Sequence, residues 1–355
     1  AVAVYTNDLD EGRGDVYVAV GLGRQLERLG FDVIYLPQGD WYHLPRGTAV
    51  YLAMLDWVEP TRIPADVLRV AWIRNRTEAW AAQSWLPSYD LVLCSSSLTE
   101  DRIRRVYPGP TGLLPLAVDA ELFKPQGRDD DRVGAVATQN HWGTERIAHE
   151  FIRRGDLSFP IALYGQDRGI APELKQHVRG PVSFFSLPSL YSQAAVVVDD
   201  LLVQNAPFGN TNSRVFEAIA CGAVTLTNQT LGLDDLDLPL PVYRTPGGLA
   251  ELIEAELAGR ALRPEVKALQ QTVLQRHSYA IRASQFVDNL ERVQRGDTGS
   301  APPQIIGSYP DYRNTPFQEM LWSRLRSEGA IPIAVQDDLD PSALLEAVAD
   351  TKVFH

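Results

Sequence analysis

The segment NAPFGNTNSRVFEAIACGAVTLTN, residues 205–228, contains the pattern that decides the fold. It opens with a loop rich in Asn and Gly, and the small polar residues before Arg214 are favourable helix N-caps. Gly222 favours the end of a short helix, and the apolar residues that follow predict a buried strand. A loop, a helix and a buried strand in this order form one unit of a sheet that is covered by helices.

The same alternation continues on both sides of this segment. Upstream lie the strand-like runs VGAVAT, PIALYG, VSFF and AVVVDD, with helices predicted from about 143 to 153 and 188 to 193, and downstream lie helices over 248–258 and about 264–293. The first half repeats the order with AVAVYT, a helix whose apolar stripe is Val16, Val20, Gly23, Leu26 and Leu29, then FDVIYLP, TAVYLAML, LRVAWI, YDLVLCSS and TGLLPLAV. The sequence therefore predicts an α/β protein with two Rossmann-like domains.

The length of the chain and its polar, turn-rich segments indicate two domains and a remainder. At about 150 residues per domain, 355 residues correspond to a little over two domains. The polar run PQGRDDDR predicts a junction, which gives domains 1–126 and 127–295. QRGDTGSAPP reads as a linker, and residues 296–355 repeat strand, loop, helix and strand as a short α/β extension. This extension is either the truncated start of another domain or an accessory unit that packs on the first two.

Composition excludes several classes of protein. A net charge of −12 argues against a general nucleic-acid-binding or anionic-membrane surface. The longest aliphatic run, Ala194–Val198, is too short for a membrane span. Cys94 and Cys221 lie far apart in apolar contexts, which indicates reduced core residues. With no secretory signal visible at its start, the chain is expected to be cytoplasmic.

The helix start near Ser213 has the features of an anion site. Free N–H groups at a helix N-terminus attract phosphate, and Arg214 adds a positive charge. Glu217 lies on about the same face and can accept hydrogen bonds from ribose hydroxyls. Two interpretations remain open: a site for a nucleotide diphosphate, or an ordinary capping pattern with an Arg–Glu surface pair.

The segment also resembles a known family. NTNSRVFEAIACGAVTLTN is similar to the donor-site signature of retaining glycosyltransferases of family four and the related group-one glycosyltransferases. PLAVDAELFKP, VRGPVSFFSLPSLYSQAAVVVDD and QRHSYAIRASQFVDNL resemble the family's neighbouring segments in the same order, so that the likeness covers about residues 1–295. It implies a B-type (GT-B) fold whose two domains face a cleft, and retaining, metal-independent transfer from a UDP- or GDP-sugar to a hydroxyl of a glycan or another acceptor, as in polysaccharide biosynthesis. No cofactor is implied.

The resemblance carries over to single residues. Glu217 matches the second glutamate of the family's Glu-x7-Glu motif, implied to bind ribose, whereas Gly209 stands where the first glutamate would be. The implied donor-binding residues are Phe208, Gly209, Asn210, Asn212, Ser213, Arg214, Glu217, Gly12, Gly14, Asn140, His141, Arg146 and Gly165. The acceptor is expected at Arg74, Asn75 and Arg76, which lie at a predicted strand end beside Trp72 and Trp80. No residue is identified as a catalytic nucleophile.

Other functions are weighed against the glycosyltransferase interpretation. Gly209 in place of a glutamate leaves open a catalytically inactive binding or scaffolding module of a larger protein. A nicotinamide-dependent oxidoreductase lacks its fingerprint, because Gly21 and Gly23 fall inside a predicted helix. Asp199 and Asp200 do not supply enough converging oxygens for a metal site. The tail residues TPFQ loosely resemble the opening of a second transferase, which would be fused to the first.

Overall fold

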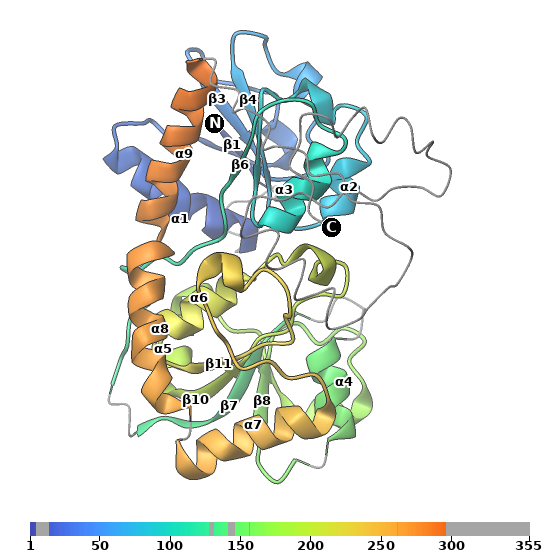
Figure 1. Ribbon diagram of the computed structural model, residues 1–355, viewed down its shortest axis with the longest axis vertical. Coiled ribbons are helices and arrows are strands. Elements are labelled where there is room, and N and C mark those ends of the chain that lie inside the picture. The colour runs from blue at the N-terminus through green and yellow to red at the C-terminus, as the bar shows by residue number, and fades with distance from the viewer. Residues whose placement is uncertain (5–13, 128–130, 141–145, 156, 261, 296–355) are drawn as a thin grey trace, which may run out of the picture. The chain divides into compact units, whose positions relative to one another are not determined.

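The computed structural model describes residues 1–4, 14–127, 131–140, 146–155, 157–260 and 262–295. The predicted extension 296–355 and the predicted site residues Gly12 and His141 lie outside these ranges. The described part of the chain contains two parallel sheets with helices, as the sequence predicts (Figure 1).

The first sheet has six parallel strands in the order β2-β1-β3-β4-β5-β6. Its strands are β1 (Val2–Ala3), β2 (Tyr35–Leu36), β3 (Val50–Ala53), β4 (Leu68–Ile73), β5 (Leu91–Cys94) and β6 (Thr111–Leu113). Its connections include the helices α1 (Gly14–Arg28), α2 (Thr77–Ala81) and α3 (Ser97–Arg104). The strand order reverses between β1 and β3, the kind of point where open α/β sheets form a ligand crevice.

The second sheet has five parallel strands in the order β9-β8-β7-β10-β11. Its strands are β7 (Val133–Thr138), β8 (Ile161–Tyr164), β9 (Val178–Gly180), β10 (Ala194–Val198) and β11 (Val224–Leu226). The helices that go with it are α4 (Ile147–Arg154), α5 (Leu187–Gln193), α6 (Ser213–Ala220), α7 (Pro246–Gly259) and α8 (Arg263–Arg276). Here the order reverses between β7 and β10, so the residues that follow these two strands are placed to contact a ligand.

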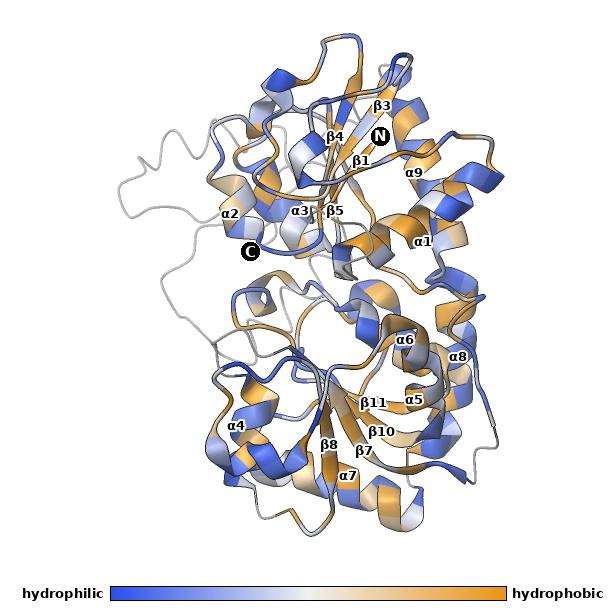
Figure 2. Ribbon diagram, turned by 180° about the vertical axis from the view of Figure 1, so that it is seen from behind, coloured by the Kyte–Doolittle hydropathy of each residue, from blue (hydrophilic) through white to orange (hydrophobic). Residues whose placement is uncertain are grey.

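Each sheet is buried on both faces. In β4, Val70 and Trp72 belong to one core cluster, whereas Ala71 and Ile73 belong to another. Successive side chains of a strand point to opposite faces, and in a parallel sheet covered by helices both faces are dry. Figure 2 shows the result as hydrophobic colouring along the strands and on the helix faces that meet them. Cys94 and Cys221 are buried free cysteines, as expected.

One predicted helix is two helices. The apolar spacing over 264–293 predicts a single long helix, but α8 ends at Arg276 and α9 (Tyr279–Gln294) begins three residues later. Ser278 is extended, with φ −89° and ψ 157°, and it bridges Val118 in place of continuing the helix. Local spacing could not reveal this pairing, because Val118 is distant in sequence. The predicted apolar stripe of α1 also ends early, since Leu29 is 51% exposed.

The break returns the chain to the first sheet. Tyr279, Phe286 and Leu290 of α9 belong to the same core cluster as Val16 and Leu22 of α1, although α9 follows the second sheet in sequence. Two stretches of chain therefore pass between the sheets, one near Val118 and one near Ser278. The domain boundary near residue 126 stays a prediction.

A buried arginine, Arg282, contacts both stretches of chain that pass between the sheets, which we call the two crossings. Arg282 donates from Nε to Pro115 O (2.9 Å) and from Nη1 to Arg276 O (3.0 Å), and its Nη2 lies 2.7 Å from His277 Nδ1. Burial and the neighbouring Arg282 charge lower the pKa of His277 to about 4. The imidazole is thus neutral near pH 7, with Nδ1 accepting from Arg282 and Nε2 donating to Leu236 O (2.8 Å).

Helix α1 approaches α9 at a glycine. A Cβ atom placed on Gly21 would lie 2.5 Å from Cε2 of the buried Tyr279 ring. We expect Gly21→Ala to lower the free energy of unfolding, because overpacking costs about 1–3 kcal/mol and the gain in helix propensity is at most about 1 kcal/mol. Thermal or denaturant unfolding measures the change.

Gly247→Ala is the matched control. Gly247 also lies in a helix, α7, but a Cβ there would meet no atom within 4 Å. This variant should be as stable as the wild type or slightly more stable. Equal stability of Gly21→Ala and the wild type would contradict the close packing of α1 on α9.

Candidate functional site

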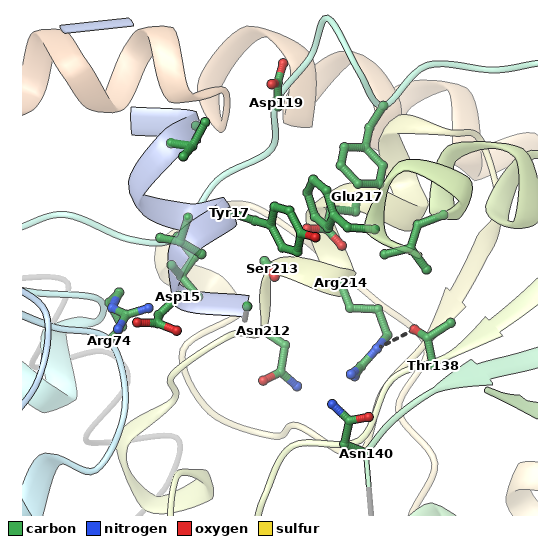
Figure 3. Close-up of a pocket in the computed structure, with 18 of the residues that line it drawn as sticks. Asp15, Tyr17, Arg74, Asp119, Thr138, Asn140, Asn212, Ser213, Arg214 and Glu217 are labelled. Carbon is green, nitrogen blue, oxygen red and sulfur yellow. Dashed lines mark hydrogen bonds between the residues drawn. The ribbon is translucent and has the colours of Figure 1, made fainter. Parts of the chain in front are cut away.

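A cavity of about 600 Å³ is lined by residues that belong to both sheets and their helices. On the first-sheet side the lining comes from α1 and from the residues after β3 and β4, and on the second-sheet side from the ends of β7 and β8, residues 181–187 and α6. Figure 3 shows part of this lining. The predicted site residues that line the cavity are Gly14, Arg74, Asn75, Arg76, Asn140, Arg146, Gly165, Asn212, Ser213, Arg214 and Glu217.

Arg214 is held in place at the point where the second sheet reverses its strand order. Its Nη1 donates to Asp199 Oδ1 at 2.7 Å, and its Nε donates to Thr138 Oγ1 at 2.9 Å. Thr138 ends β7 and Asp199 follows β10, so the carboxyl ends of these two neighbouring strands hold the guanidinium in place. Burial alone would lower the pKa of Arg214, but Asp199, Tyr191 and Glu217 together raise it. Arg214 is therefore charged at the cavity wall.

The N-terminus of α6 lies beside this guanidinium. Its N-cap residue is Asn212, whose side chain makes no capping hydrogen bond but donates to Asp199 Oδ1 at 2.9 Å. By contrast, Ser96 and Thr245 accept from backbone N–H groups at the starts of α3 and α7. No side-chain cap therefore occupies the N–H groups of Ser213 and Arg214, whereas the Val215 N–H donates to Asn212 O, and the helix dipole favours an anion at this end of α6.

Arg146 is a second cation on the same side. Among the described residues, its hydrogen bonds go to the backbone carbonyls of Asn140 and Asp200, at 3.2–3.3 Å. Burial and then the nearby Arg214 charge lower the pKa of Arg146. Two cations that repel each other in a partly buried site are stabilised by an anion that neutralises both.

Glu217 lies in the second turn of α6 and is buried. Burial raises the pKa of its carboxyl to about 7, against the opposing effects of Arg214 and of a hydrogen bond from Ser213. A carboxylate one turn from an anion site can accept hydrogen bonds from hydroxyl groups of the same ligand. The site therefore combines anion binding and hydroxyl binding.

Gly165 shapes the second-sheet side of the cavity. It follows β8 with φ +141°, and a Cβ there would lie 2.1 Å from the carbonyl oxygen of Gln139. Only glycine permits this approach of the two strand ends. Pro181 and Val182 line the cavity from the next strand connection.

The first-sheet side carries the predicted acceptor residues. Arg74 is the first residue after β4 and is 7% exposed, whereas Asn75 and Arg76 are exposed. Arg76 has φ 53° and donates from Nε and Nη2 to Asp56, both at 3.1 Å. Its guanidinium carbon lies 5.4 Å from the centre of the Trp57 ring, which also lines the cavity. Trp72 and Trp80, by contrast, are core residues.

Sequence reasoning missed the aromatic part of the lining. Tyr17 of α1 stacks on Phe184 with ring centres 3.8 Å apart, and Phe185 packs edge-on against both rings. Tyr17, Gly21 and Arg24 recur at helical spacing, so a second stripe along α1 could have identified the face that lines the cavity. No local pattern pairs Tyr17 with Phe184, because this contact depends on the tertiary fold.

Three predicted donor residues do not line the cavity. The Asn210 side chain and the Phe208 carbonyl contact the residues that follow β5, whereas Gly209 packs against Leu231 and Gly232. The Asn210 side chain is buried, and its Oδ1 accepts from Ser95 Oγ at 2.8 Å and from Thr99 Oγ1 at 2.7 Å. These residues join the loop before α6 to the start of α3. Contact between them and a donor stays a prediction.

The acidic pair after β10 is used within the protein. Asp199 accepts from Arg214, Asn212 and Thr227, and Asp200 accepts from Asn228 at 3.0 Å. Burial raises the pKa of Asp200 to about 6. Within the described ranges, no group of three or more acidic, His or Cys side chains is arranged to hold a metal ion. Nor does any described helix have the length and apolar character needed to cross a membrane.

Asn210 gives a direct test of the contact between the two halves. We expect Asn210→Ala to lower the free energy of unfolding by about 1–3 kcal/mol, because buried hydroxyls lose their acceptor. Thermal unfolding measures this loss, with the exposed Asn75→Ala as the control. Equal losses in the two variants would contradict a buried contact.

The raised pKa of Glu217 predicts a pH-dependent stability. Between pH 4.5 and about 7 the folded protein keeps a proton that the unfolded chain releases, so the free energy of unfolding falls as pH rises through this window. Glu217→Gln removes the loss. We expect this variant to be more stable than the wild type by about 1–3 kcal/mol near pH 8 and equally stable near pH 4.5. Denaturant unfolding at both pH values measures the difference, and a pH-independent difference would contradict it.

Comparisons with known proteins bear on the fold of the chain. Residues 144–288 match a family described as glycosyl transferase-like. Among solved structures, the chain is similar to sucrose-phosphate synthase from Thermosynechococcus elongatus, with a TM-score of 0.63 at 15% identity over 83% of this chain and 99% of that one. It is also similar to HepE from Anabaena in complex with UDP and glucose, with a TM-score of 0.61 at 12% identity over 82% of this chain and 99% of that one. No curated protein matches the chain.

A third similar structure is a glycosyltransferase from Rickettsia africae, with a TM-score of 0.56 at 10% identity over 83% of this chain and 98% of that one. At these identities the likeness establishes the fold, which is the two-domain GT-B fold. This confirms the predicted fold class.

Proposed function

Because the chain has the GT-B fold and carries a glycosyl transferase-like domain over residues 144–288, we propose that it transfers a sugar from a nucleotide-sugar donor to a hydroxyl of an acceptor. The donor is a UDP- or GDP-sugar, and the acceptor is a glycan or another hydroxyl compound. HepE, one of the similar structures, was solved with UDP and glucose, which supports a nucleotide sugar as donor.

The observation that carries this proposal is the pair of neighbouring arginines at the uncapped start of α6. Arg214 is fixed by Asp199 and Thr138, and the hydrogen bonds of Arg146 to the described part of the chain go to carbonyl groups. A diphosphate bound here would accept from the first N–H groups of α6 and neutralise both cations. The same contacts would stabilise the charge that develops on the leaving nucleoside diphosphate, which lowers the barrier to transfer.

Glu217 and Gly165 complete the donor side in this proposal. Glu217, one turn into α6, would accept hydrogen bonds from the ribose hydroxyls. Gly165 and the adjacent residues Pro181 and Val182 would border the base. Arg74, Asn75 and Arg76 would hold the acceptor from the opposite side. Retention at the anomeric carbon and transfer without a metal remain parts of the proposal that rest on the family resemblance.

A second candidate function is a binding module without transfer, and one observation favours it. Gly209, which replaces the first motif glutamate, has φ +60°, and a Cβ there would lie 2.9 Å from Gly232 Cα. A glutamate could not occupy this position without a change in the loop. Hydrolysis or transfer of a nucleotide sugar by the purified protein would exclude this alternative.

Nucleotide binding tests the donor site. We expect UDP or GDP to raise the melting temperature of the wild type, because a ligand that binds only the folded state stabilises it. Arg146→Gln and Glu217→Ala should weaken nucleotide affinity about tenfold or more, since each removes a hydrogen bond to a charged group or a hydroxyl pair. Calorimetric titration measures these affinities.

Arg154→Gln is the control for this experiment. Arg154 lies on α4, near Arg146 in sequence, but its guanidinium is 62% exposed and pairs with Glu150. It should keep the wild-type affinity. The proposal fails if neither nucleotide binds, or if Glu217→Ala leaves the affinity unchanged.

A further inference from the structure

The charge of the cavity lining differs in sign from that of the chain. Its described residues include five arginines and three acidic residues, whereas the whole chain carries a net charge of −12. The five arginines are Arg24, Arg74, Arg76, Arg146 and Arg214, and the acidic residues are Asp15, Asp119 and Glu217. A cationic cavity in an acidic protein favours anionic ligands.

Three of these arginines are already ion-paired. Arg24 lies 3.7 Å from Asp119, Arg76 lies 3.1 Å from Asp56, and Arg214 lies 2.7 Å from Asp199. Within the part of the chain that the structure describes, Arg74 and Arg146 form no ion pair. One lies on the first-sheet side of the cavity and the other on the second-sheet side. The proposed donor diphosphate accounts for Arg146 but leaves Arg74 unexplained.

Arg74 is buried with an incomplete set of hydrogen bonds. Its side chain is the first after β4, the residue is 7% exposed, and Nη2 donates to Met54 O at 2.9 Å. Its Nε is buried and has no hydrogen-bond partner among the described residues. A buried guanidinium without an ion pair is costly to the folded protein, so its presence at a cavity wall indicates a ligand that compensates it.

The groups that face Arg74 leave room for such a ligand. Asp15, at the start of α1, and Tyr279, at the start of α9, oppose the effect of burial, which nevertheless lowers the pKa of Arg74. Figure 3 shows Asp15 beside Arg74, yet the two do not form an ion pair. The neighbouring Arg76 is engaged by Asp56 and Trp57. Among the described cations on this side of the cavity, Arg74 therefore keeps hydrogen-bonding capacity for a ligand.

We propose that Arg74 binds an anionic substituent of the acceptor, so that the acceptor is a sugar or glycan that bears a phosphate or a carboxylate. This inference rests on the proposed function, because it takes the first-sheet side of the cavity as the acceptor side. A guanidinium donates to two oxygens of such a group in a fixed geometry.

The experiment compares anionic and neutral sugars on the full chain by calorimetric titration in the presence of UDP. The probes are glucose 6-phosphate, glucuronate, glucose and inorganic phosphate. We expect at least one of the two anionic sugars to bind about tenfold or more tightly than glucose. The phosphate and carboxylate arms identify the substituent. Inorganic phosphate shows how much of the affinity comes from the anion alone.

Two cavity variants and one control locate the anion. Arg74→Gln should weaken the anionic sugar about tenfold or more and leave UDP affinity within about twofold, whereas Arg146→Gln should do the reverse. Arg102→Gln on α3, whose guanidinium pairs with Glu78 away from the cavity, should change neither. If Arg74→Gln does not fold, the comparison of sugars on the wild type still decides.

The outcomes separate this inference from the proposed function. Anionic sugars that bind no more tightly than glucose overturn the inference, and so does an anion whose affinity falls with Arg146→Gln but not with Arg74→Gln. In both cases, if UDP still binds, the proposed donor site is supported although the inference about Arg74 fails. Should neither UDP nor GDP bind while an Arg74-dependent anionic sugar still binds, the proposed function fails and the anion site stands.

Discussion

The cavity depends on a constraint at the two places where the chain passes between its sheets. There the buried Arg282 guanidinium donates to the carbonyl of Pro115 on one crossing and to that of Arg276 on the other. Neutral His277 takes part in the same set of bonds. One multiply bonded guanidinium therefore holds together the two stretches of chain that pass between the sheets. The Asn210 contact with Ser95 and Thr99 joins the halves at a second place.

The arginines that line the cavity differ in whether they are ion-paired. Asp199 is fully buried and holds Arg214, so the charge of that arginine is oriented and partly balanced. Arg146 and Arg74 form no ion pair among the described residues, and they lie on opposite sides of the cavity. The ion-paired Arg214 has a fixed orientation, whereas Arg146 and Arg74 have charge and hydrogen-bond donors that a ligand can use. It also marks the two positions at which we propose that anions bind, one for a diphosphate donor and one for an acidic acceptor.

Three glycines lie where two segments of the chain approach closely, and each has a different role. Gly21 lets α1 lie against Tyr279, and Gly165 lets the end of β8 approach Gln139. Gly209 permits a left-handed turn against Gly232. The sequence alone suggested that Gly209 is a loss, a missing glutamate. The structure adds that the loop before α6 needs a residue without a side chain at that point, because this loop packs against residues 231–232.

The amino-acid sequence by itself determined the two parallel sheets, the burial of both cysteines and the helix start that carries Ser213, Arg214 and Glu217. These features depend on local spacing, capping and apolar runs, which are readable along the chain. Only the tertiary structure decided the break between α8 and α9, the stacking of Tyr17 on Phe184, the pairing of Arg76 with Asp56, and the placement of Asn210 outside the cavity. Each of these depends on partners distant in sequence, and nothing in a local pattern specifies which distant segment will become a neighbour.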